Sequence, residues 1–249
     1  MLKDLHAHST YCDGKCAPEE MVLAAIDKGL TTFGISGHSY TAFDPSYCMQ
    51  KEDVPRFIAE INYLKAKYFD RIHVLCGVEQ DYYSGETTDG FDYAIGSVHY
   101  LHFGAEYIPV DWSADILRSA AEKYCGGDIY ALCEEYYRTA GDVVNRTSCD
   151  LIGHFDLISK FNEKERLFDE SHPRYVATWQ KAVDELLKAD VPFELNTGGI
   201  YRGYMSRPYP SAAIIAYIKA RGGRLELSSD AHTTDAIGYG FDQYENLIG

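Results

Sequence analysis

The sequence predicts an α/β fold in which parallel strands close into a barrel, and three observations support this prediction. Short runs rich in β-branched and aromatic residues alternate with longer helical patterns from one end of the chain to the other. This alternation is typical of a parallel sheet covered by helices, and seven strands favour a closed barrel over an open sheet. A length of 249 residues, 46% of them hydrophobic, fits one such barrel, so we expect a single domain over residues 1–249.

The predicted strands are apolar runs separated by turn residues or by helical patterns. They cover residues 3–8, 32–38, 72–79, 92–99, 150–154, 192–197 and 224–230. The link between the third and the fourth strand is too short for a helix, so we expect one irregular unit in the barrel.

The predicted helices cover residues 18–29, 53–68, 113–124, 127–146, 172–189 and 210–221. Residues that favour helix starts precede or open four of them: Pro18, Asp53, Ser113 and Pro210. Paired glycines at 222–223 provide a stop signal. The loops at 39–52 and 198–209 are long and rich in Gly, Pro and Tyr, and long loops of this kind often carry function.

Composition excludes several classes of partner. The chain has 38 acidic and 23 basic residues and a formal charge of −15, which argues against nucleic acid and anionic membranes because both need a basic face. We find neither an apolar run of roughly 20 residues nor the apolar stretch of a signal peptide. Seven cysteines without paired spacing are typical of free thiols in a reducing cytoplasm, so we expect a cytoplasmic protein.

Histidines gather at the ends of the predicted strands, with carboxylates beside them. The set is His6, His8, Asp13, His38, Glu79, His99, His154, Asp230 and His232. The carboxyl ends of barrel strands meet at one rim, where active sites lie. Burying so many titratable groups without a cation costs on the order of several kcal/mol, so the pattern predicts a metal site at this rim. Imidazoles with a minority of carboxylates suit Zn²⁺, Mn²⁺ or Fe²⁺ better than Ca²⁺.

Other chemically capable residues are expected to be structural. We assign His73, His102 and His172 no functional role, since a lone histidine is more often hydrogen-bonded than a ligand. The three-residue spacer between Cys12 and Cys16 does not match a zinc knuckle, so we expect packed free thiols there.

Seven motifs in a fixed order resemble the polymerase-and-histidinol-phosphatase (PHP) superfamily. They are DLHAHSTYCDG, GISGHS, GVEQDY, GSVHY, GHFDL, ELNTGG and SSDAH, and they run from residue 4 to about 238. More narrowly, ELNTGGIYRG and the DLISKF that follows His154 are similar to the monofunctional histidinol-phosphate phosphatase branch.

The resemblance implies a distorted TIM-like (β/α)7 barrel that holds three divalent ions at the C-terminal ends of its strands. The first ion would be bound by His6, His8, Glu79 and Asp230, with Glu79 as the bridge to the second ion. The second would also contact His99 and His154, and the third would contact Asp13, His38 and His232. The resemblance has one departure: superfamily members can carry His where this chain has Asp13, which makes the third site the least regular.

The expected mechanism is attack on phosphorus by a hydroxide that bridges two ions. Arg202 is our first choice for the phosphate clamp, because its fork binds two oxygens at once, and Lys160 is the second. Asn196 could donate to the phosphate or to a substrate amine, or else cap the turn after its strand. Either Asp230 or His232 would protonate the leaving oxygen.

The leading hypothesis is hydrolysis of L-histidinol phosphate to L-histidinol and phosphate, a step of histidine biosynthesis. A second hypothesis keeps the chemistry and changes the ester to a nucleotide, a sugar or a phosphotyrosyl group. A third, less favoured because the ligand set is complete, is an inactive metal-bearing scaffold. The expected partner is a small-molecule phosphate monoester, with no nucleic acid and no membrane; the oligomeric state stays open.

Overall fold

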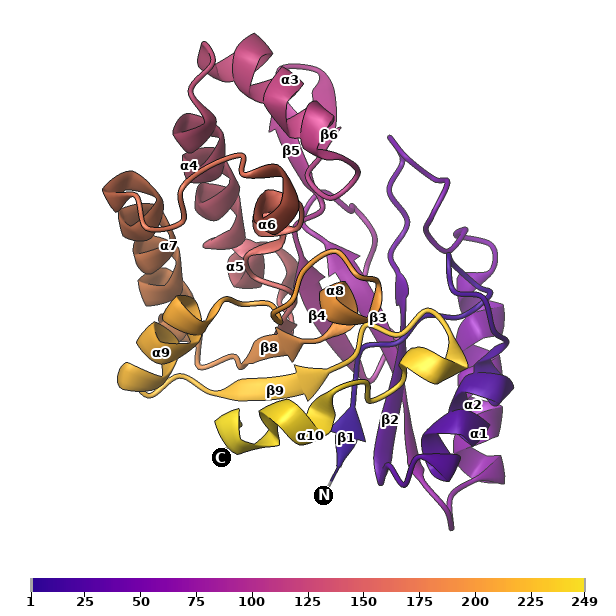
Figure 1. Ribbon diagram of the computed structural model, residues 1–249. Coiled ribbons are helices and arrows are strands. Elements are labelled where there is room, and N and C mark those ends of the chain that lie inside the picture. The colour runs from indigo at the N-terminus through magenta and orange to yellow at the C-terminus, as the bar shows by residue number, and fades with distance from the viewer. Residues whose placement is uncertain (1, 249) are drawn as a thin grey trace.

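Seven parallel strands form the central sheet of the protein, as a computed structural model that describes residues 2–248 shows. Their order is β1-β2-β3-β4-β7-β8-β9, so each strand pairs with the next one of the sheet along the chain (Figure 1). Their bounds are β1 (Lys3–Asp4), β2 (Thr32–His38), β3 (His73–Asp81), β4 (Tyr93–Ser97), β7 (Leu151–Ile152), β8 (Phe193–Asn196) and β9 (Leu225–Ser228).

The two edges of this sheet meet, so the sheet is a nearly closed barrel. Beyond β1, Ala7 forms a parallel bridge with Ala231, which follows β9. The amide of His8 donates to the carbonyl of Ala231 at 2.7 Å, and the amide of Ala231 donates to the carbonyl of His6 at 3.2 Å. The predicted barrel is confirmed, and its closure places the first strand beside the last.

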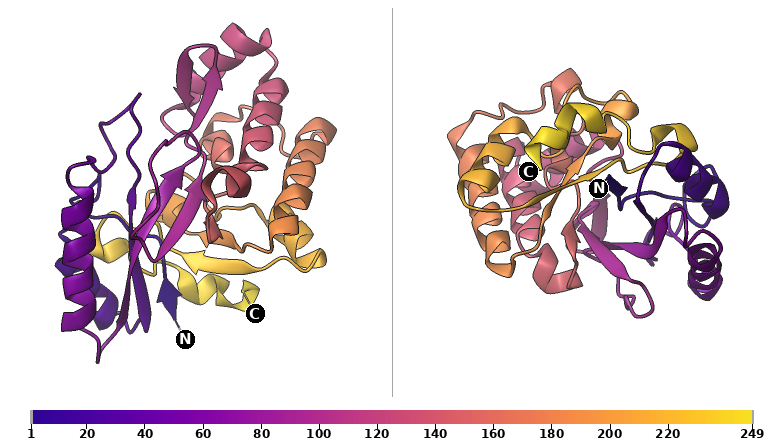
Figure 2. Two further views of the ribbon diagram at one scale, coloured as in Figure 1. Left: turned by 180° about the vertical axis from the view of Figure 1, so that it is seen from behind. Right: turned by 90° about the horizontal axis from the view of Figure 1, so that it is seen from below.

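Helices cover the outside of the barrel, as the view from below in Figure 2 shows. The bounds of the longer helices are α1 (Pro18–Asp27), α2 (Val54–Lys67), α3 (Ala114–Cys125), α4 (Ile129–Ala140), α7 (Pro173–Leu186) and α9 (Ala212–Ala220). The short helices are α5 (Val143–Thr147), α6 (Asn162–Glu165), α8 (Gly198–Tyr201) and α10 (Phe241–Tyr244). Among the described residues, no helix is both long and apolar enough to cross a membrane.

Tyr93 fills the interior of the barrel, and two glycines make room for it. A Cβ at Gly34 would lie 2.0 Å from the Tyr93 hydroxyl oxygen, and a Cβ at Gly77 would lie 2.2 Å from Cζ of the same ring. The Tyr93 hydroxyl donates to the carbonyl of Leu5. The barrel is therefore packed below the rim, and any ligand has to enter from the rim.

The structure corrects several local predictions. The predicted helix over 127–146 breaks at Gly141 into α4 and α5, and the predicted loop 198–209 opens with α8. The last long helix begins after Ser211, which is its N-cap, and not at Pro210. An antiparallel hairpin that we did not predict, β5 (Tyr100–Phe103) with β6 (Glu106–Pro109), projects beside α3 (Figure 2). Its strands are short and partly polar, so they give only a weak periodic signal.

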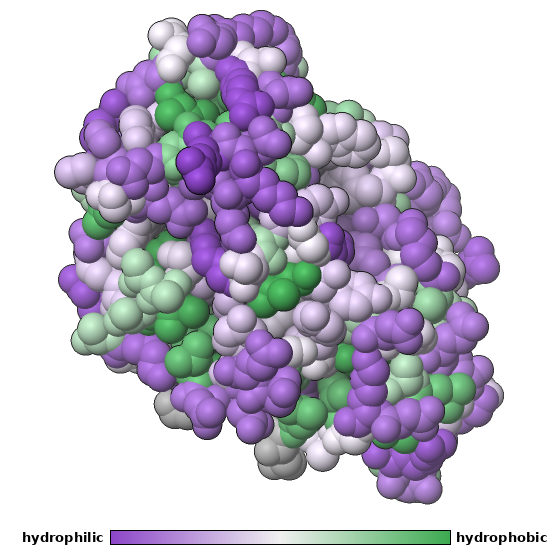
Figure 3. Space-filling model, viewed as in Figure 1, coloured by the Kyte–Doolittle hydropathy of each residue, from purple (hydrophilic) through white to green (hydrophobic). Residues whose placement is uncertain are grey.

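The outer surface is mostly polar on the face that Figure 3 shows. The hydrophobic residues on this face form small separate groups. This distribution is typical of a surface that meets water over most of its area.

Candidate metal centre and mouth of the barrel

The strands deliver the predicted ligand residues to one rim. His38 is the last residue of β2, and Glu79 lies two residues before the end of β3. His99 and His154 each follow a strand by two residues. Because parallel strands all end at the same rim, residues that are far apart in the sequence come within reach of one another.

Glu79 lies at the centre of this group. Its Oε2 is 3.1 Å from Nε2 of His6 and 2.8 Å from Nδ1 of His38. Its other oxygen, Oε1, is 3.0 Å from Nε2 of His154 and 3.3 Å from Nε2 of His99. The carboxylate thus separates two sets of imidazoles, one on each oxygen, which is an arrangement suited to bridging two ions.

A second group gathers around Asp13, in the loop after β1. Its Oδ1 lies 3.6 Å from Nε2 of His38, and its Oδ2 lies 3.2 Å from Nε2 of His232. His8 completes the group, with Nδ1 at 3.9 Å from Asp13 Oδ1. The donor atoms of these four residues all lie within 4.8 Å of one another, as a shared ion requires.

Asp230 faces the first group from the end of β9. Its Oδ1 lies 3.3 Å from Nε2 of His8 and 3.8 Å from Nε2 of His6. Its backbone is left-handed, with φ of 50°, a conformation that costs free energy in any residue but glycine. All nine predicted ligand residues therefore come together at the rim.

Charge and burial in the cluster favour metal binding. Burial disfavours an ionised Glu79, but His6, His38 and His99 outweigh it and hold the pKa of this carboxyl well below its ordinary value. Burial, with His232 and His38 nearby, lowers the pKa of His8 to about 3, so at pH 7 this ring is neutral and keeps a lone pair.

Among the described residues, several buried ligand atoms make no hydrogen bond, although charged neighbours lie close to them. They are Nε2 of His6, Nε2 of His8, Oδ1 of Asp13 and Oε2 of Glu79. Buried polar atoms are nearly always hydrogen-bonded, so a convergent set without partners marks the place of a cation. Nitrogen and carboxylate donors in this ratio fit divalent first-row metals.

The PHP domain family matches residues 4–198 of the chain. The chain belongs to this family. A probable histidinol-phosphatase of Deinococcus radiodurans is 30% identical over 253 residues, which cover 96% of this chain and 90% of the relative. A probable histidinol-phosphatase of Schizosaccharomyces pombe is 26% identical over 95% of this chain and 82% of its own length.

Solved structures agree with the PHP fold. The putative histidinol phosphatase HisK of Listeria monocytogenes superimposes with a TM-score of 0.84 and 21% identity, over 97% of this chain and 99% of that chain. The histidinol phosphate phosphatase of Lactococcus lactis, solved with zinc, L-histidinol and phosphate, gives a TM-score of 0.73 and 21% identity, over 99% and 92% of the two chains. The predicted family and fold are confirmed, and the protein is a metal-dependent phosphatase.

A hollow of about 380 Å³ opens above the ligand cluster of this PHP domain. Lys160 and Arg202 both line it. Nζ of Lys160 lies 3.2 Å from Asp111 Oδ2 and 4.5 Å from the centre of the Tyr204 ring. Lys15 also lines the hollow, so three cationic side chains lie at the mouth of a protein that is acidic overall.

Asn196 lies below this mouth and is fully buried. Its Oδ1 accepts from the amide of Gly198 at 2.8 Å, which is the turn-capping contact that we considered as the alternative to substrate binding. Its Nδ2 lies 3.0 Å from Glu194 Oε2 and 3.4 Å from Asp230 Oδ2. Asn196 thus contacts two acids of the site from beneath.

The residues expected to be structural lie apart from the ligand cluster or have no ligand geometry. His73 is exposed at the start of β3, His102 stacks on Tyr107 in the hairpin, and His172 is the N-cap of α7. Cys12 and Cys16 are unpaired thiols outside the groups that could hold an ion, although Sγ of Cys12 lies 3.5 Å from Nδ1 of His8.

Two acids that we did not predict contact ligand histidines: Asp81 and Glu194. Each lies two residues along a strand from another site residue, Glu79 or Asn196. The period of two places such pairs on one face of the strand, and that was the available signal.

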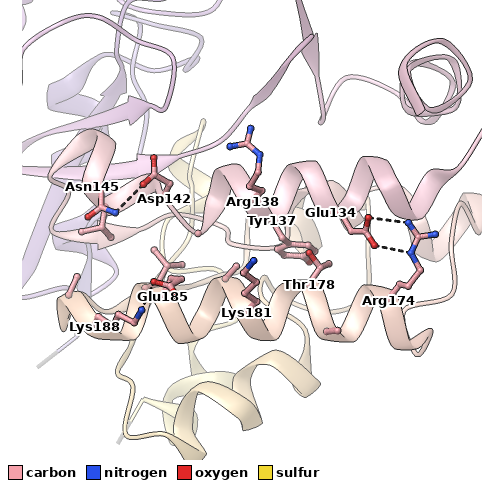
Figure 4. Close-up of a pocket in the computed structure, with 16 residues that line it drawn as sticks. Glu134, Tyr137, Arg138, Asp142, Asn145, Arg174, Thr178, Lys181, Glu185 and Lys188 are labelled. Atoms are coloured by element: carbon pink, nitrogen blue, oxygen red, sulfur yellow. Dashed lines mark hydrogen bonds and ion pairs between the residues drawn. The ribbon is translucent and has the colours of Figure 1, made fainter. Parts of the chain in front are cut away.

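A larger hollow of about 820 Å³ lies between α4 and α7 (Figure 4). Several of its polar side chains are paired with one another: Arg174 contacts Glu134 at 2.8 Å, and Asn145 donates to Asp142 at 3.0 Å. Among the described residues, the groups that could hold a metal ion all lie in the barrel mouth and not in this hollow. Size alone therefore does not mark the active site here.

Proposed function

We propose that this PHP protein hydrolyses L-histidinol phosphate to L-histidinol and phosphate, a step of histidine biosynthesis. The observation that carries the proposal is the ligand cluster centred on Glu79, which lies at the base of a mouth lined by Arg202 and Lys160. A phosphate monoester needs both features, because divalent ions activate the attack and basic side chains receive the anion. Two curated relatives that cover nearly the whole chain are named probable histidinol-phosphatases.

We further propose that three divalent ions, of zinc, manganese or iron, occupy the cluster. The first would be held by His6, His8, Glu79 and Asp230, the second by Glu79, His99 and His154, and the third by Asp13, His38 and His232. When bound, such ions lower the pKa of water towards 7 and polarise phosphoryl oxygens. Three donor groups found in the cluster support this count, although they overlap and do not follow the three sets member by member.

Arg202 and Lys160 are the residues that we assign to the phosphate. Arg202 is the C-cap of α8, and its side chain, which lines the mouth, is 28% exposed. Lys160 is held by Asp111, so its ammonium is already in place before a ligand arrives. A fork that binds two oxygens fixes the orientation of the ester for in-line attack, while an ammonium adds charge.

Proton delivery to the leaving oxygen is assigned to Asp230. A histidine nitrogen that binds an ion has no proton to give, and Nε2 of His232 lies in the group around Asp13. A carboxylate keeps a second oxygen when the first is bound, so Asp230 would accept the proton that the attacking water loses and pass it to the leaving oxygen. Burial opposes ionisation of Asp230, but Arg202 and His6 outweigh it and hold the pKa of this carboxyl well below its ordinary value, so it starts as a base.

The upper wall of the mouth suits the rest of the substrate. It carries two acids, Asp44 and Asp111, and four aromatic side chains, Tyr47, Tyr100, Trp112 and Tyr204. Histidinol phosphate has an ammonium group, which carboxylates attract, and an imidazole, which packs on aromatic rings. The same wall suits a nucleotide or sugar phosphate less well, since neither brings an ammonium group.

A panel of phosphate esters tests the assignment. We expect kcat/KM for L-histidinol phosphate to exceed that for p-nitrophenyl phosphate, a sugar phosphate, a nucleotide and phosphotyrosine by at least about 10²-fold, because the wrong ester leaves polar groups of the binding wall unpaired. Similar and high kcat/KM values for all esters would mean that the protein is a phosphatase whose substrate is not histidinol phosphate. No turnover of any ester, with metals bound, would indicate a scaffold.

We also propose that the reaction takes place in the cytoplasm. All seven cysteines are unpaired, and Cys48, Cys76, Cys133 and Cys149 are buried. Free buried thiols are most common in a reducing compartment.

A further inference from the structure

Two carboxylates lie buried directly behind histidines of the metal centre. Glu194 is in β8 and Asp81 is the last residue of β3, and their side chains are 0% and 3% exposed. Each contacts Nδ1 of a histidine, while Nε2 of the same ring faces Glu79. In this way one ring nitrogen is turned to a buried acid and the other to the cluster.

Glu194 receives hydrogen bonds on both of its oxygens. Oε1 lies 2.5 Å from Nδ1 of His6 and accepts from the hydroxyl of Ser228. Oε2 accepts from the amide of His154 at 2.6 Å and from Nδ2 of Asn196 at 3.0 Å. An ionised carboxylate only accepts, so the nitrogen that meets it has to be the protonated one.

Asp81 repeats this pattern at the other side of Glu79. Its Oδ2 lies 3.1 Å from Nδ1 of His99 and accepts from the amide of the same residue at 3.2 Å. Its Oδ1 accepts from the amide of Tyr83 at 2.8 Å. Two backbone amides and one ring nitrogen thus hold this carboxylate in place beside His99.

We propose that Glu194 and Asp81 are positioning residues that fix His6 and His99 as Nδ1-protonated tautomers, so that each Nε2 keeps its lone pair for an ion. Nε2 of His6 is 3.1 Å from Glu79 Oε2, and Nε2 of His99 is 3.3 Å from Glu79 Oε1. The two acids thus prepare one ligand on each side of the bridging carboxylate. This inference rests on the metal centre of the proposed function and not on its substrate.

A purely structural role predicts something different. A carboxylate that only fills a polar gap in the barrel contributes to the free energy of unfolding, and the ring tautomer does not depend on it. A positioning carboxylate controls which nitrogen carries the proton, and its removal typically weakens metal binding by about 10- to 100-fold. Tautomer and metal affinity therefore separate the two roles.

The variants Glu194→Gln and Asp81→Asn test the proposal in the full-length protein. A carboxylate accepts hydrogen bonds on both oxygens, whereas an amide accepts on its oxygen and donates from its nitrogen. In Glu194→Gln the amide nitrogen therefore faces groups that are themselves donors. We expect Zn²⁺ affinity, measured on metal-depleted protein by competition with a chromogenic chelator, to fall by about 10- to 100-fold in each variant. We also expect the ¹⁵N shifts of the imidazole in the metal-depleted wild type to identify His6 and His99 as Nδ1-protonated, and this signature to change in the variant that lacks the partner.

Val183→Ala is the matched control. Val183 is fully buried in α7, a helix that packs against α4, and its truncation lowers stability without touching the cluster. The control should keep both the Zn²⁺ affinity and the imidazole shifts of the wild type. A similar fall in affinity in Val183→Ala would mean that general destabilisation explains the effect and would overturn the proposal.

The other outcomes are equally decisive. Variants that bind Zn²⁺ as tightly as the wild type overturn the positioning role and leave the metal centre intact. A wild type that binds no Zn²⁺ overturns the metal centre itself. If Glu194→Gln does not fold, Asp81→Asn and the wild-type shifts still decide, because a neutral His6 or His99 that carries its proton on Nε2 and not on Nδ1 contradicts the proposal.

Discussion

Arg202 and Asp230 form one unit at the mouth of the barrel. The guanidinium donates to Oδ2 of Asp230 at 2.8 Å and to the carbonyl of the same residue at 3.0 Å, while Oδ1 lies 3.3 Å from Nε2 of His8. Arg202 thus holds the side chain and the backbone of a residue with a left-handed conformation. The cation that we assign to the phosphate also orients an acid of the metal centre.

This coupling gives the first prediction. Arg202→Ala should lower kcat/KM for histidinol phosphate by roughly 30- to 1,000-fold, because charge-assisted contacts in the transition state contribute about 2–4 kcal/mol. It should also reduce bound metal, since Asp230 loses its partner. Arg202→Lys should recover part of the activity, because an ammonium cannot contact Asp230 and a phosphate with the same fork. Steady-state kinetics with elemental analysis checks this; a decrease under threefold would leave Lys160 as the phosphate ligand.

Replacement of the central carboxylate gives the second prediction. Glu79→Gln keeps the shape of the side chain but removes the charge that faces imidazoles on both oxygens. We expect fewer metal equivalents per chain and a kcat at least about 10²-fold lower, because the ions supply the nucleophile. The metal content from elemental analysis and the value of kcat should decrease together. Wild-type values for both would remove Glu79 from the ligand set.

Metal removal is the third prediction. The chain buries unpaired donor atoms on His6, His8 and Glu79, so an ion that binds them stabilises only the folded state. Zn²⁺ at about 100 times its Kd should raise the melting temperature of EDTA-treated protein by roughly 5–10 °C and restore activity. Ca²⁺ should do neither, because it prefers oxygen ligands. Calorimetry measures the melting temperature with each ion. An equal increase with Zn²⁺ and Ca²⁺ would contradict a site in which nitrogen atoms bind the ion.

The positions of the strands and ligands were predictable because their signals are local. An apolar run that ends in a histidine or an acid defines both a strand and its end, and the barrel then brings all such ends to one rim. His38 at the end of β2 is an example, since strand and ligand were read from the same seven residues. This prediction did not require knowing which residues contact one another in the folded protein.

The features that were missed depend on long-range partners. Glu194 contacts His6, which lies 188 residues earlier in the chain. The period of two places Glu194 on the same face of its strand as Asn196, but it does not identify His6 as the partner. The glycines at the start of α8 predicted a loop, because glycine disfavours helices in isolation. Packing of α8 against Asp230 overrides that preference, and the sequence does not encode this contact locally.

Substrate recognition gives the fourth prediction, through Trp112. Its side chain lines the mouth yet is 74% exposed, so truncation should leave the fold intact. If the ring packs on the imidazole of the substrate, Trp112→Ala should raise KM for histidinol phosphate by about 3- to 10-fold with little change in kcat, given roughly 0.5–1.5 kcal/mol for an aromatic pair. The KM for p-nitrophenyl phosphate should change less.

Phe69→Ala is the control for Trp112, because Phe69 is 82% exposed and lies outside the mouth. It should leave both KM values unchanged. An unchanged KM for histidinol phosphate in Trp112→Ala would exclude this ring from the binding surface.

The last prediction concerns Gly198, the first residue of α8. A Cβ at this position would lie 2.9 Å from Nη2 of Arg202 and 3.0 Å from both Cβ of Asp230 and the carbonyl oxygen of Ser229. The carbonyl belongs to the backbone and cannot move aside, so Gly198→Ala should push α8 outwards and separate Arg202 from Asp230. Forced contacts of this kind cost about 1–3 kcal/mol. If this cost adds to the activation free energy, kcat/KM falls by roughly 5- to 150-fold. Gly85→Ala, in an open loop where a Cβ meets nothing within 4 Å, should keep wild-type kinetics. Equal kinetics for the two variants would show that close packing of α8 on Asp230 is not needed for catalysis.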